Sequence, residues 1–337
     1  KFRQLLMLYS IRVNQQSVKS VANAKGGRPN CLYSMKNTHL QHPEDSILTG
    51  DLSVLDCFLA KDSILSVKID GAPAIVWGTN PATGNFFVGT KSVFNKKLIK
   101  INETHDDIDR NHCGIVCDIL HRCFDCLPRI NWIAQGDFIG YGGDDTFCPN
   151  TITYIFDEII TQDIIIAPHT VYVAEHDLRD AVASPLVLCP KSTDRCLFVK
   201  PDCWQVDEDF DEIVAFARQM STLCEFITEK QSRQVQQQLN SIIRAGLDID
   251  DLTLEALAFA NQIDINVLRL WSLVRSIKDD MLFMMRNNGP KAYINDKQCQ
   301  GEGYVMSADR MMFKFVNRDV FSYANFNTGR MSQRGVA

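Results

Sequence analysis

The sequence lacks any run of apolar residues long enough to cross a bilayer, and it contains no low-complexity tract. A membrane-spanning helix needs about 20 mainly apolar residues, so we expect no membrane partner. The chain also lacks an excess of positive charge, because 35 Lys and Arg stand against 41 Asp and Glu and give a net charge of −6. Proteins that bind nucleic acid by bulk attraction are usually basic. Any contact with nucleic acid must therefore be concentrated on one face.

We also expect no secretory signal. Residues 1–9 are basic and apolar, but they contain no long apolar core and no clear cleavage site. We therefore expect an ordinary N-terminal element and a cytoplasmic location. In that setting the twelve cysteines are expected to be reduced thiols.

Four of the cysteines lie close together in the sequence: Cys113, Cys117, Cys123 and Cys126. Cys123 and Cys126 form a CxxC pair, and two histidines, His112 and His121, are nearby, so the four ligands of a zinc site are available. Alternatively, residues 115–124 form a helix in which cysteines serve as small apolar core residues. Helical periodicity favours this second interpretation, and the first stays open.

What the sequence does contain is a chain of 337 residues, 45% apolar and 23% charged, which is enough for a full core in one large or two ordinary domains. Alternating and apolar segments predict strands at residues 64–70, 74–78, 85–89, 132–139, 151–156, 170–173, 303–306 and 312–316. The turn residues at 80–84 predict a hairpin between the second and third strands. Helical spacing predicts a helix over residues 107–127, a short one near residues 52–59, and several over residues 209–287.

The order of these segments predicts an α+β protein. Residues 61–206 and 288–337 would form one β-rich body. A helical insertion, residues 207–287, would interrupt it and is large enough to fold as a small domain. Residues 1–60 would form an N-terminal segment that packs on this core.

The segment Lys68-Ile69-Asp70-Gly71 places a lysine at the end of a predicted strand, before a turn that glycine permits. Strand side chains repeat every two residues, so Asp70 is expected on the same face as Lys68. An amine attacks a phosphate only after it loses its proton, and desolvation or nearby positive charge favours that loss. Lysine and aspartate also occur together in ordinary solvated turns, so this segment alone assigns no function.

This segment resembles the first motif of the covalent nucleotidyltransferases, the superfamily of DNA ligases, RNA ligases and mRNA capping enzymes. Further blocks resemble that superfamily's other motifs in the expected order: Gly89-Thr90-Lys91-Ser92, Gln135-Gly136-Asp137-Phe138, Thr153-Tyr154-Ile155-Phe156, Gly301-Glu302-Gly303-Tyr304-Val305 and Phe313-Lys314-Phe315-Val316. Several ordered blocks are far more specific than one.

The resemblance implies a ligase-type adenylyltransferase fold (ATP-grasp-like) of antiparallel sheets with flanking helices. It implies that Lys68 attacks the α-phosphate of ATP to form a covalent lysyl-AMP, that Glu302 serves a Mg²⁺ or Mn²⁺ ion, and that Lys314 contacts the α-phosphate. The other implied contacts of the nucleotide are Val67, Asp70, Gly71, Lys91, Asp137, Tyr154, Phe156, Tyr304 and Arg318, with Asp137 a second candidate metal ligand. Such a set suits phosphoryl-type transfer, which depends on in-line positioning and charge neutralisation.

Three departures from the superfamily pattern bear on activity. Many members carry two lysines, spaced KxK, in the last block. Here Val316 occupies the second position, so that phosphate contact is missing or is supplied by Arg318. Asp137 stands where glutamate is common, and Lys91 stands where arginine is common and cannot form the same planar fork. Lysine adenylylation remains the expectation, whereas the later sealing step is less well supported.

Other residues have structural alternatives. At least one of Tyr154 and Phe156 is expected in the core, and Tyr304 suits packing as well as base stacking. His39 and His42 could contact the polyphosphate of a nucleotide, but turn or N-cap roles are favoured. His169 is expected to be structural, at the entry to a strand. The predicted helical insertion carries cations that could grip nucleic acid, although such charges are usually only solvated: Lys230, Arg233 and Arg244.

Longer segments resemble a ligase-like family of tailed-phage proteins: residues 38–45, 70–75, 86–91 and 316–322. We therefore expect an ATP-dependent polynucleotide ligase, phage- or virus-related, that passes AMP to a 5′-phosphate end before a 3′-hydroxyl displaces it. RNA is preferred to DNA, because about twenty residues follow Lys314 and leave no room there for the OB-fold domain of DNA ligases and capping enzymes. Two alternatives are a ligase-derived module that binds a nucleotide or a nucleic-acid end without sealing, and a capping-type guanylyltransferase.

Overall fold

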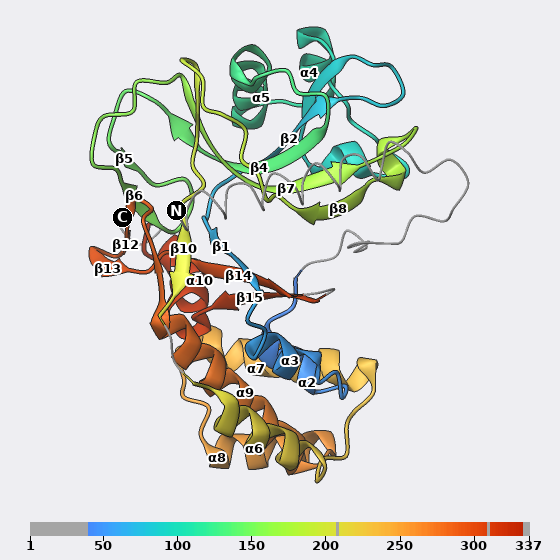
Figure 1. Ribbon diagram of the computed structural model, residues 1–337, viewed down its shortest axis with the longest axis vertical. Helices are drawn as coiled ribbons and strands as arrows, with labels where there is room; N and C mark the ends of the chain where they lie inside the picture. The colour runs from blue at the N-terminus through green and yellow to red at the C-terminus, as the bar shows by residue number, and fades with distance from the viewer. Residues whose placement is uncertain (1–39, 207–208, 309–310, 333–337) are drawn as a thin grey trace. The chain divides into compact units, whose positions relative to one another are not determined.

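The computed structural model of the protein describes residues 40–206, 209–308 and 311–332, which belong to one unit, residues 35–337. The chain is α+β, as predicted, with antiparallel sheets and several helices (Figure 1). The expectations for the N-terminal element and for Thr38 and His39 lie outside the described residues.

The largest sheet has six strands and comes from the first half of the chain. Its strands are β3 (Phe86–Gly89), β2 (Ala74–Thr79), β4 (Ile133–Tyr141), β7 (Ile164–Val173) and β8 (Val182–Pro185) in that order, with β9 (Cys196–Phe198) parallel to β7. The strands β2 and β3 form the predicted hairpin. Buried Trp77 and Ile166 of this sheet share a core with Leu120 and Cys123 of α5 (Ile115–Cys126), so this helix covers one face.

The helix expected over residues 107–127 is in fact two helices, α4 (His105–Asn111) and α5. Thr104 and Asp107 form a capping box that starts α4. Between the helices Gly114 has a φ of +62°, a left-handed conformation that glycine adopts without a steric penalty. The prediction therefore missed a turn that the single glycine permits.

The strand expected at residues 170–173 begins earlier, at Ile164, so His169 lies inside β7 and the prediction of a strand entry was wrong. Pairing with β4 passes from Gly136 opposite Pro168 to Gln135 opposite Thr170. His169 is thus the extra residue of a β-bulge, a place where a sheet tolerates proline.

Three smaller sheets join distant parts of the sequence. One contains β1 (Ile64–Lys68), β14 (Gly303–Ala308) and β15 (Met311–Val316). Another orders β13 (Lys297–Cys299), β12 (Lys291–Ile294), β6 (Thr153–Ile155) and β5 (Thr146–Phe147), and β10 (Cys203–Gln205) pairs with β11 (Met285–Asn287). The first and second of these sheets bring residues near 300 against residues near 68 and 154.

The helical region predicted at residues 209–287 is confirmed. It contains α6 (Asp211–Ser221), α7 (Glu229–Arg244), α8 (Asp251–Asn261) and α9 (Ile265–Met284). These helices lie with α2 (Pro43–Ile47) and α3 (Ser53–Phe58) below the three-stranded sheet in Figure 1, and α10 (Arg318–Ser332) follows β15. One core joins Val274 of α9 and Val54 of α3 to Phe315 of β15. The helical block therefore supports the sheet that carries Lys68.

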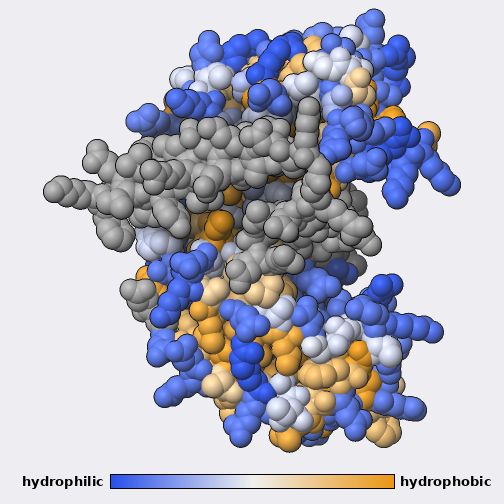
Figure 2. Space-filling model, turned by 45° about the vertical axis from the view of Figure 1, so that its right-hand side comes forward, coloured by the Kyte–Doolittle hydropathy of each residue, from blue (hydrophilic) through white to orange (hydrophobic). Residues whose placement is uncertain are grey.

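The surface of the helical block is more apolar than that of the six-stranded sheet on the face drawn in Figure 2. Exposed large apolar side chains in this block include Phe216, Leu252, Phe259 and Phe283. None of the described helices is both long and apolar enough to span a membrane.

Candidate functional site

The register of the three-stranded sheet brings the first and the fifth motif-like blocks together. Lys68, the last residue of β1, lies opposite Gly303 of β14. Glu302, immediately before that glycine, therefore lies beside Lys68, and its carboxylate forms a short ion pair with the lysine amine. The Glu302 side chain is 8% exposed and that of Lys68 is 32% exposed. The Lys68 amine is thus paired with a buried carboxylate, while the lysine side chain remains partly exposed to solvent.

Two glycines permit this close approach. A Cβ on Gly303 would lie 2.0 Å from the carbonyl oxygen of Phe315, so a larger residue would push β14 away from β15. A Cβ on Gly71 would lie 2.8 Å from the carbonyl oxygen of Phe138 and 2.9 Å from Cβ of Asp137. The chain after Lys68 can therefore lie against β4 only because residue 71 has no side chain.

Lys314 lies on the neighbouring strand β15, opposite Val305 of β14. Burial lowers the pKa of Lys314, and the positive charge of Lys68 lowers it further. Burial also raises the pKa of Glu302, while Lys68 acts in the opposite direction. Lys68 and Glu302 therefore both lie close enough to Lys314 to affect its pKa.

Asp70 is buried and held by several hydrogen bonds. Its carboxylate accepts them from the Asn150 side-chain amide at 3.1 Å and from the Thr151 backbone N–H at 3.2 Å. Its own backbone N–H donates to the Tyr154 hydroxyl at 2.7 Å. These contacts fix the turn after Lys68 against β6, and they occupy both oxygens of the Asp70 carboxylate.

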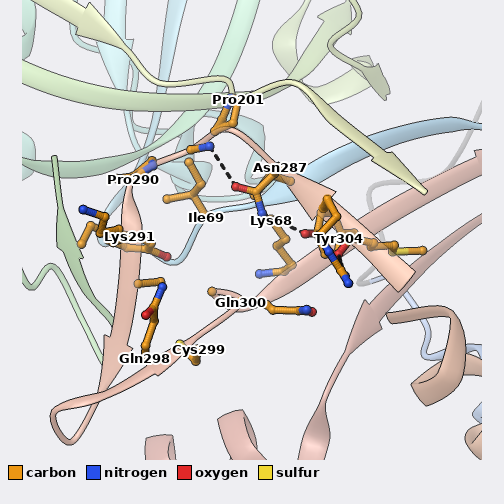
Figure 3. Close-up of a pocket in the computed structure, with 17 residues that line it drawn as sticks. Lys68, Ile69, Pro201, Asn287, Pro290, Lys291, Gln298, Cys299, Gln300 and Tyr304 are labelled. Atoms are coloured by element: carbon orange, nitrogen blue, oxygen red, sulfur yellow. Dashed lines mark hydrogen bonds between the residues drawn. The ribbon is translucent and has the colours of Figure 1, made fainter. Parts of the chain in front are cut away.

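A cavity of about 310 Å³ opens beside Lys68 (Figure 3). Of the predicted residues, Val67, Lys68, Tyr154 and Tyr304 line it. Polar groups from the β11–β13 region complete the wall: Asn287, Lys291, Gln298 and Gln300. Local sequence patterns did not indicate these four residues, because their place at the cavity depends on tertiary contacts such as the pairing of β12 with β6.

The aromatic residues expected to stack on a base are largely packed. Tyr154 and Tyr304 are buried, and each contributes an edge to the cavity wall. The Tyr304 hydroxyl accepts a hydrogen bond from the Asn287 side chain at 2.8 Å. Phe156 packs edge-on against Phe147 at 5.7 Å between ring centroids. The expectation that at least one of Tyr154 and Phe156 lies in the core is confirmed, because Tyr154 is buried.

Asp137 lies on β4, beside the turn that contains Gly71, and it is close enough to Glu302 to raise the pKa of that carboxyl group. His169 approaches Asp137 at 3.7 Å between Nε2 and Oδ2, and its Nδ1 lies 2.7 Å from the Thr170 hydroxyl. Lys91 is exposed in the 3₁₀ helix η1 (Lys91–Phe94) and lines neither of the two described cavities. The structure therefore brings Asp137 to the site and leaves Lys91 outside it.

Arg318 is 1% exposed and lies in a buried network. Its Nη1 donates to Glu44 at 2.9 Å and to Asp45 at 3.0 Å. Lys278 of α9 pairs with the same Glu44 at 3.4 Å. Arg318 thus holds α2 and α10 together and does not line the cavity beside Lys68. Glu44 and Asp45, from one segment of the family resemblance, thus contact Arg318, from another.

A second cavity, of about 360 Å³, is lined by Lys314. His42 and Arg244 also line it. His42 occupies the N-cap position of α2 without a capping hydrogen bond from its side chain, and its Nδ1 is buried without a partner. Lys230 and Arg233 are exposed on α7 and do not line this cavity.

The carboxylates near Lys68 suit a magnesium ion that is held mainly by substrate oxygens and water. Mg²⁺ commonly takes one or two protein carboxylates together with phosphates. Glu302 and Asp137 could supply them, whereas both oxygens of Asp70 are already engaged. Among the described residues, the one group of three ligand side chains within 4.8 Å of one another lies elsewhere, at Asp109, Cys117 and His121.

The interpretation that the clustered cysteines are core residues is confirmed for two of the four. Cys123 and Cys126 are buried in the core under the six-stranded sheet, which confirms that interpretation for the CxxC pair. Cys113 is exposed, and Cys117 is partly buried beside Asp109.

Comparison with known proteins places the chain in a family without assigning it an activity. No curated protein and no solved structure matches the chain. Residues 37–263 and 251–330 match one protein family, so the match extends over most of the sequence. The chain belongs to this family, which is described as a family of unknown function (DUF6267).

Proposed function

We propose that the protein is an ATP-dependent nucleotidyltransferase of the polynucleotide ligase type, which prefers RNA ends to DNA ends. One observation carries the proposal: the amine of Lys68 lines a cavity and pairs with the buried carboxylate of Glu302, and Lys314 lies near enough for the charge of Lys68 to lower its pKa. The ordered motif-like blocks of the sequence add the expectation of lysine adenylylation.

In the proposed first step, the deprotonated Lys68 amine attacks the α-phosphorus of ATP. A P–N bond forms, the bond between the α-phosphorus and the bridging oxygen breaks, and pyrophosphate leaves. The amine releases its proton to solvent through the open side of the site. Lys314 favours this step because its positive charge offsets the negative charge on the phosphate. A bound Mg²⁺ would be held by Glu302 and Asp137 and would neutralise phosphate charge.

In the proposed second step, a 5′-phosphate oxygen of a polynucleotide attacks the same phosphorus, the P–N bond breaks, and the Lys68 amine is regenerated. A 3′-hydroxyl then displaces AMP and joins the two ends. The cavity beside Lys314, which Arg244 and His42 also line, is the candidate place for these phosphates. The net negative charge of the chain makes such a local cationic site necessary.

A second candidate function is a module that binds a nucleotide or a nucleic-acid end without sealing. The position of Arg318 favours this second function. Its side chain is bound to Glu44 and Asp45, so it cannot supply the phosphate contact of the second lysine, which Val316 replaces. This alternative keeps the cavity and removes the covalent step.

Incubation with α-labelled ATP and Mg²⁺ distinguishes the two functions. We expect an acid-labile label on the wild type, none on Lys68→Ala, and normal labelling of Lys61→Ala, an exposed lysine just before β1. Labelling by GTP alone would instead support a capping-type enzyme. Saturable nucleotide binding without any covalent label would support the binding module and contradict the ligase proposal.

The acceptor is tested with the labelled enzyme after free ATP has been removed. We expect AMP to move to 5′-phosphorylated RNA faster than to DNA of the same sequence, and not to RNA with a 5′-hydroxyl. Faster transfer to DNA would contradict the RNA preference and leave the first step intact.

A further inference from the structure

The helices α4 and α5, which lie side by side over the six-stranded sheet in Figure 1, carry a second cluster of reactive side chains. Asp109 comes from α4, and Cys117 and His121 come from α5. Nε2 of His121 lies 2.9 Å from Oδ1 of Asp109, and the Cys117 thiol donates to the same oxygen at 3.7 Å. The proposed ligase reaction uses none of these residues.

The spacing within each helix explains why these groups meet. Cys117, His121 and Asp125 are successive i, i+4 positions of α5, so they share one face. His105 and Asp109 have the same spacing on α4. Packing of these two helices therefore assembles five polar side chains from two short stripes.

The three side chains have the donor atoms and separations of a zinc site. Their ligand atoms all lie within 4.8 Å of one another. Zinc bonds of about 2.0–2.3 Å place tetrahedral ligands roughly 3.3–3.8 Å apart, so only small side-chain movements are needed. A thiolate, an imidazole and a carboxylate together suit a borderline-soft ion such as Zn²⁺ better than Mg²⁺ or Ca²⁺.

Two further residues, His105 and Asp125, form a chain of contacts that orients the ring of His121. Its Nδ1 lies 2.7 Å from Nδ1 of His105, and Nε2 of His105 lies 3.1 Å from Oδ1 of Asp125. Metal-bound histidines usually donate their other ring N–H to a carboxylate or another acceptor. With an ion on Nε2, His121 would donate from Nδ1 to His105, and His105 would donate from Nε2 to Asp125. Every contact is then satisfied with both rings neutral.

We propose that Asp109, Cys117 and His121 bind one Zn²⁺ ion, with His105 and Asp125 as positioning residues. A water would complete the tetrahedral coordination, because the Asp109 side chain is 64% exposed and solvent reaches the ion from that side. The ion would join α4 to α5 and stabilise their packing on the sheet. This site differs from the CxxC pair, whose cysteines are buried in the core.

Cobalt substitution of the full chain tests the site without any activity measurement. Protein stripped with EDTA is titrated with Co²⁺ alone, and we expect one ion per chain, a cobalt–thiolate charge-transfer band and the visible bands of a tetrahedral ion. Cys117→Ser is expected to lose the thiolate band. Asp109→Asn and His105→Gln are expected to weaken binding about 10–100-fold. Asp109 and His105 are exposed, so these two variants are expected to fold.

Cys126→Ala is the matched control, since it removes a cysteine of the same helix that faces the core. We expect it to retain the cobalt spectrum, and we expect Zn²⁺ at a given concentration to raise the melting temperature of the stripped wild type by more than that of Asp109→Asn. The proposal would be overturned by the absence of saturable binding of one ion per chain, by a spectrum unchanged in Cys117→Ser, or by loss of binding in Cys126→Ala alone.

Discussion

Two lysine–glutamate pairs in this molecule have the same chemistry and different surroundings. Lys68 pairs with Glu302, and Lys278 pairs with Glu44. The side chains of Lys278 and Glu44 are both 0% exposed, whereas Lys68 is 32% exposed and lines a cavity. The difference lies in the partners around each pair.

The inner pair, Lys278 and Glu44, is enclosed by further partners from the protein itself. Lys278 also donates to the carbonyl oxygen of Val316 at 3.0 Å and pairs with Asp279 at 3.0 Å, and Glu44 accepts from Arg318 as well. Lys278 and other nearby cations hold the pKa of Glu44 well below its usual range, although burial acts in the opposite direction. Among the described residues, Glu302 is the one side chain that pairs with the Lys68 amine. A buried pair with several protein partners holds elements together, whereas an amine with one partner and an adjacent cavity is available for chemistry.

The largest expected effect comes from breaking the buried network of Arg318, Lys278, Glu44 and Asp45. Arg318→Met leaves Asp45 without its cation and removes one of the two cations paired with Glu44, and we expect the free energy of unfolding to fall by about 3–5 kcal/mol, as for other broken buried ion pairs. Denaturant unfolding measures this change. Arg269→Met, which removes an exposed pair with Asp251, is the control and should cost about 0–1 kcal/mol. A stable Arg318→Met that no longer accepts AMP would instead identify Arg318 as a phosphate contact.

Removing Lys314, the second cation near the Lys68–Glu302 pair, should affect the rate of adenylylation more than the stability of the fold. Lys314→Met takes away a charge that would stabilise the α-phosphate, and we expect the rate of covalent labelling to fall on the order of 10²–10³-fold. Single-turnover labelling measures this rate. Lys291→Met removes a largely exposed cation from the cavity wall and serves as the control, with a smaller effect. Equal losses in the two variants would show that general positive charge, and not the position of Lys314, matters.

The smallest expected effect is a dependence of stability on pH through His42. Burial lowers the pKa of His42, Glu44 opposes this shift, and the cations Arg318, Lys314 and Lys278 add to it. Below pH of about 6.5 the unfolded chain binds a proton that the folded chain resists. The free energy of unfolding should therefore fall on acidification through this range, by up to roughly 1.4 kcal/mol per pH unit.

Denaturant unfolding from pH 7.5 down to pH 5.5, about one unit on either side of that value, measures this dependence. His42→Asn should show a weaker decline over the same range. An identical decline in the variant would assign the proton uptake to another group.

Local patterns predicted much of the fold. Alternation around Lys68 and the turn residues at 80–84 predicted β1 and the β2–β3 hairpin correctly. Helical spacing predicted the region that contains α6–α9. The incorrect predictions were also local. A turn at Gly114 separates two helices that were predicted as one, and β7 continues through the bulge at His169 where a strand was predicted to begin. The hairpin of β12 and β13, which turns at Asn295 and Asp296 with positive φ, was not predicted.

The candidate site was only partly predictable, because it depends on pairing over long distances. The sequence indicated Lys68, Glu302 and Lys314 as separate blocks, but the register that sets Lys68 opposite Gly303 is a tertiary property. Arg318 was expected near phosphate, yet nothing local indicated that two acidic residues of α2 would enclose it. The contact between Asp109 and His121 likewise depends on how two helices pack.

Intact-mass spectrometry of the protein after incubation with ATP and Mg²⁺ tests the role of Lys68 most directly. We predict that the wild type gains the mass of one AMP, that a peptide map places the added group on Lys68, and that Lys278 remains unmodified. An unchanged mass with ATP and with every other nucleoside triphosphate, or a modification on a lysine other than Lys68, would contradict the account.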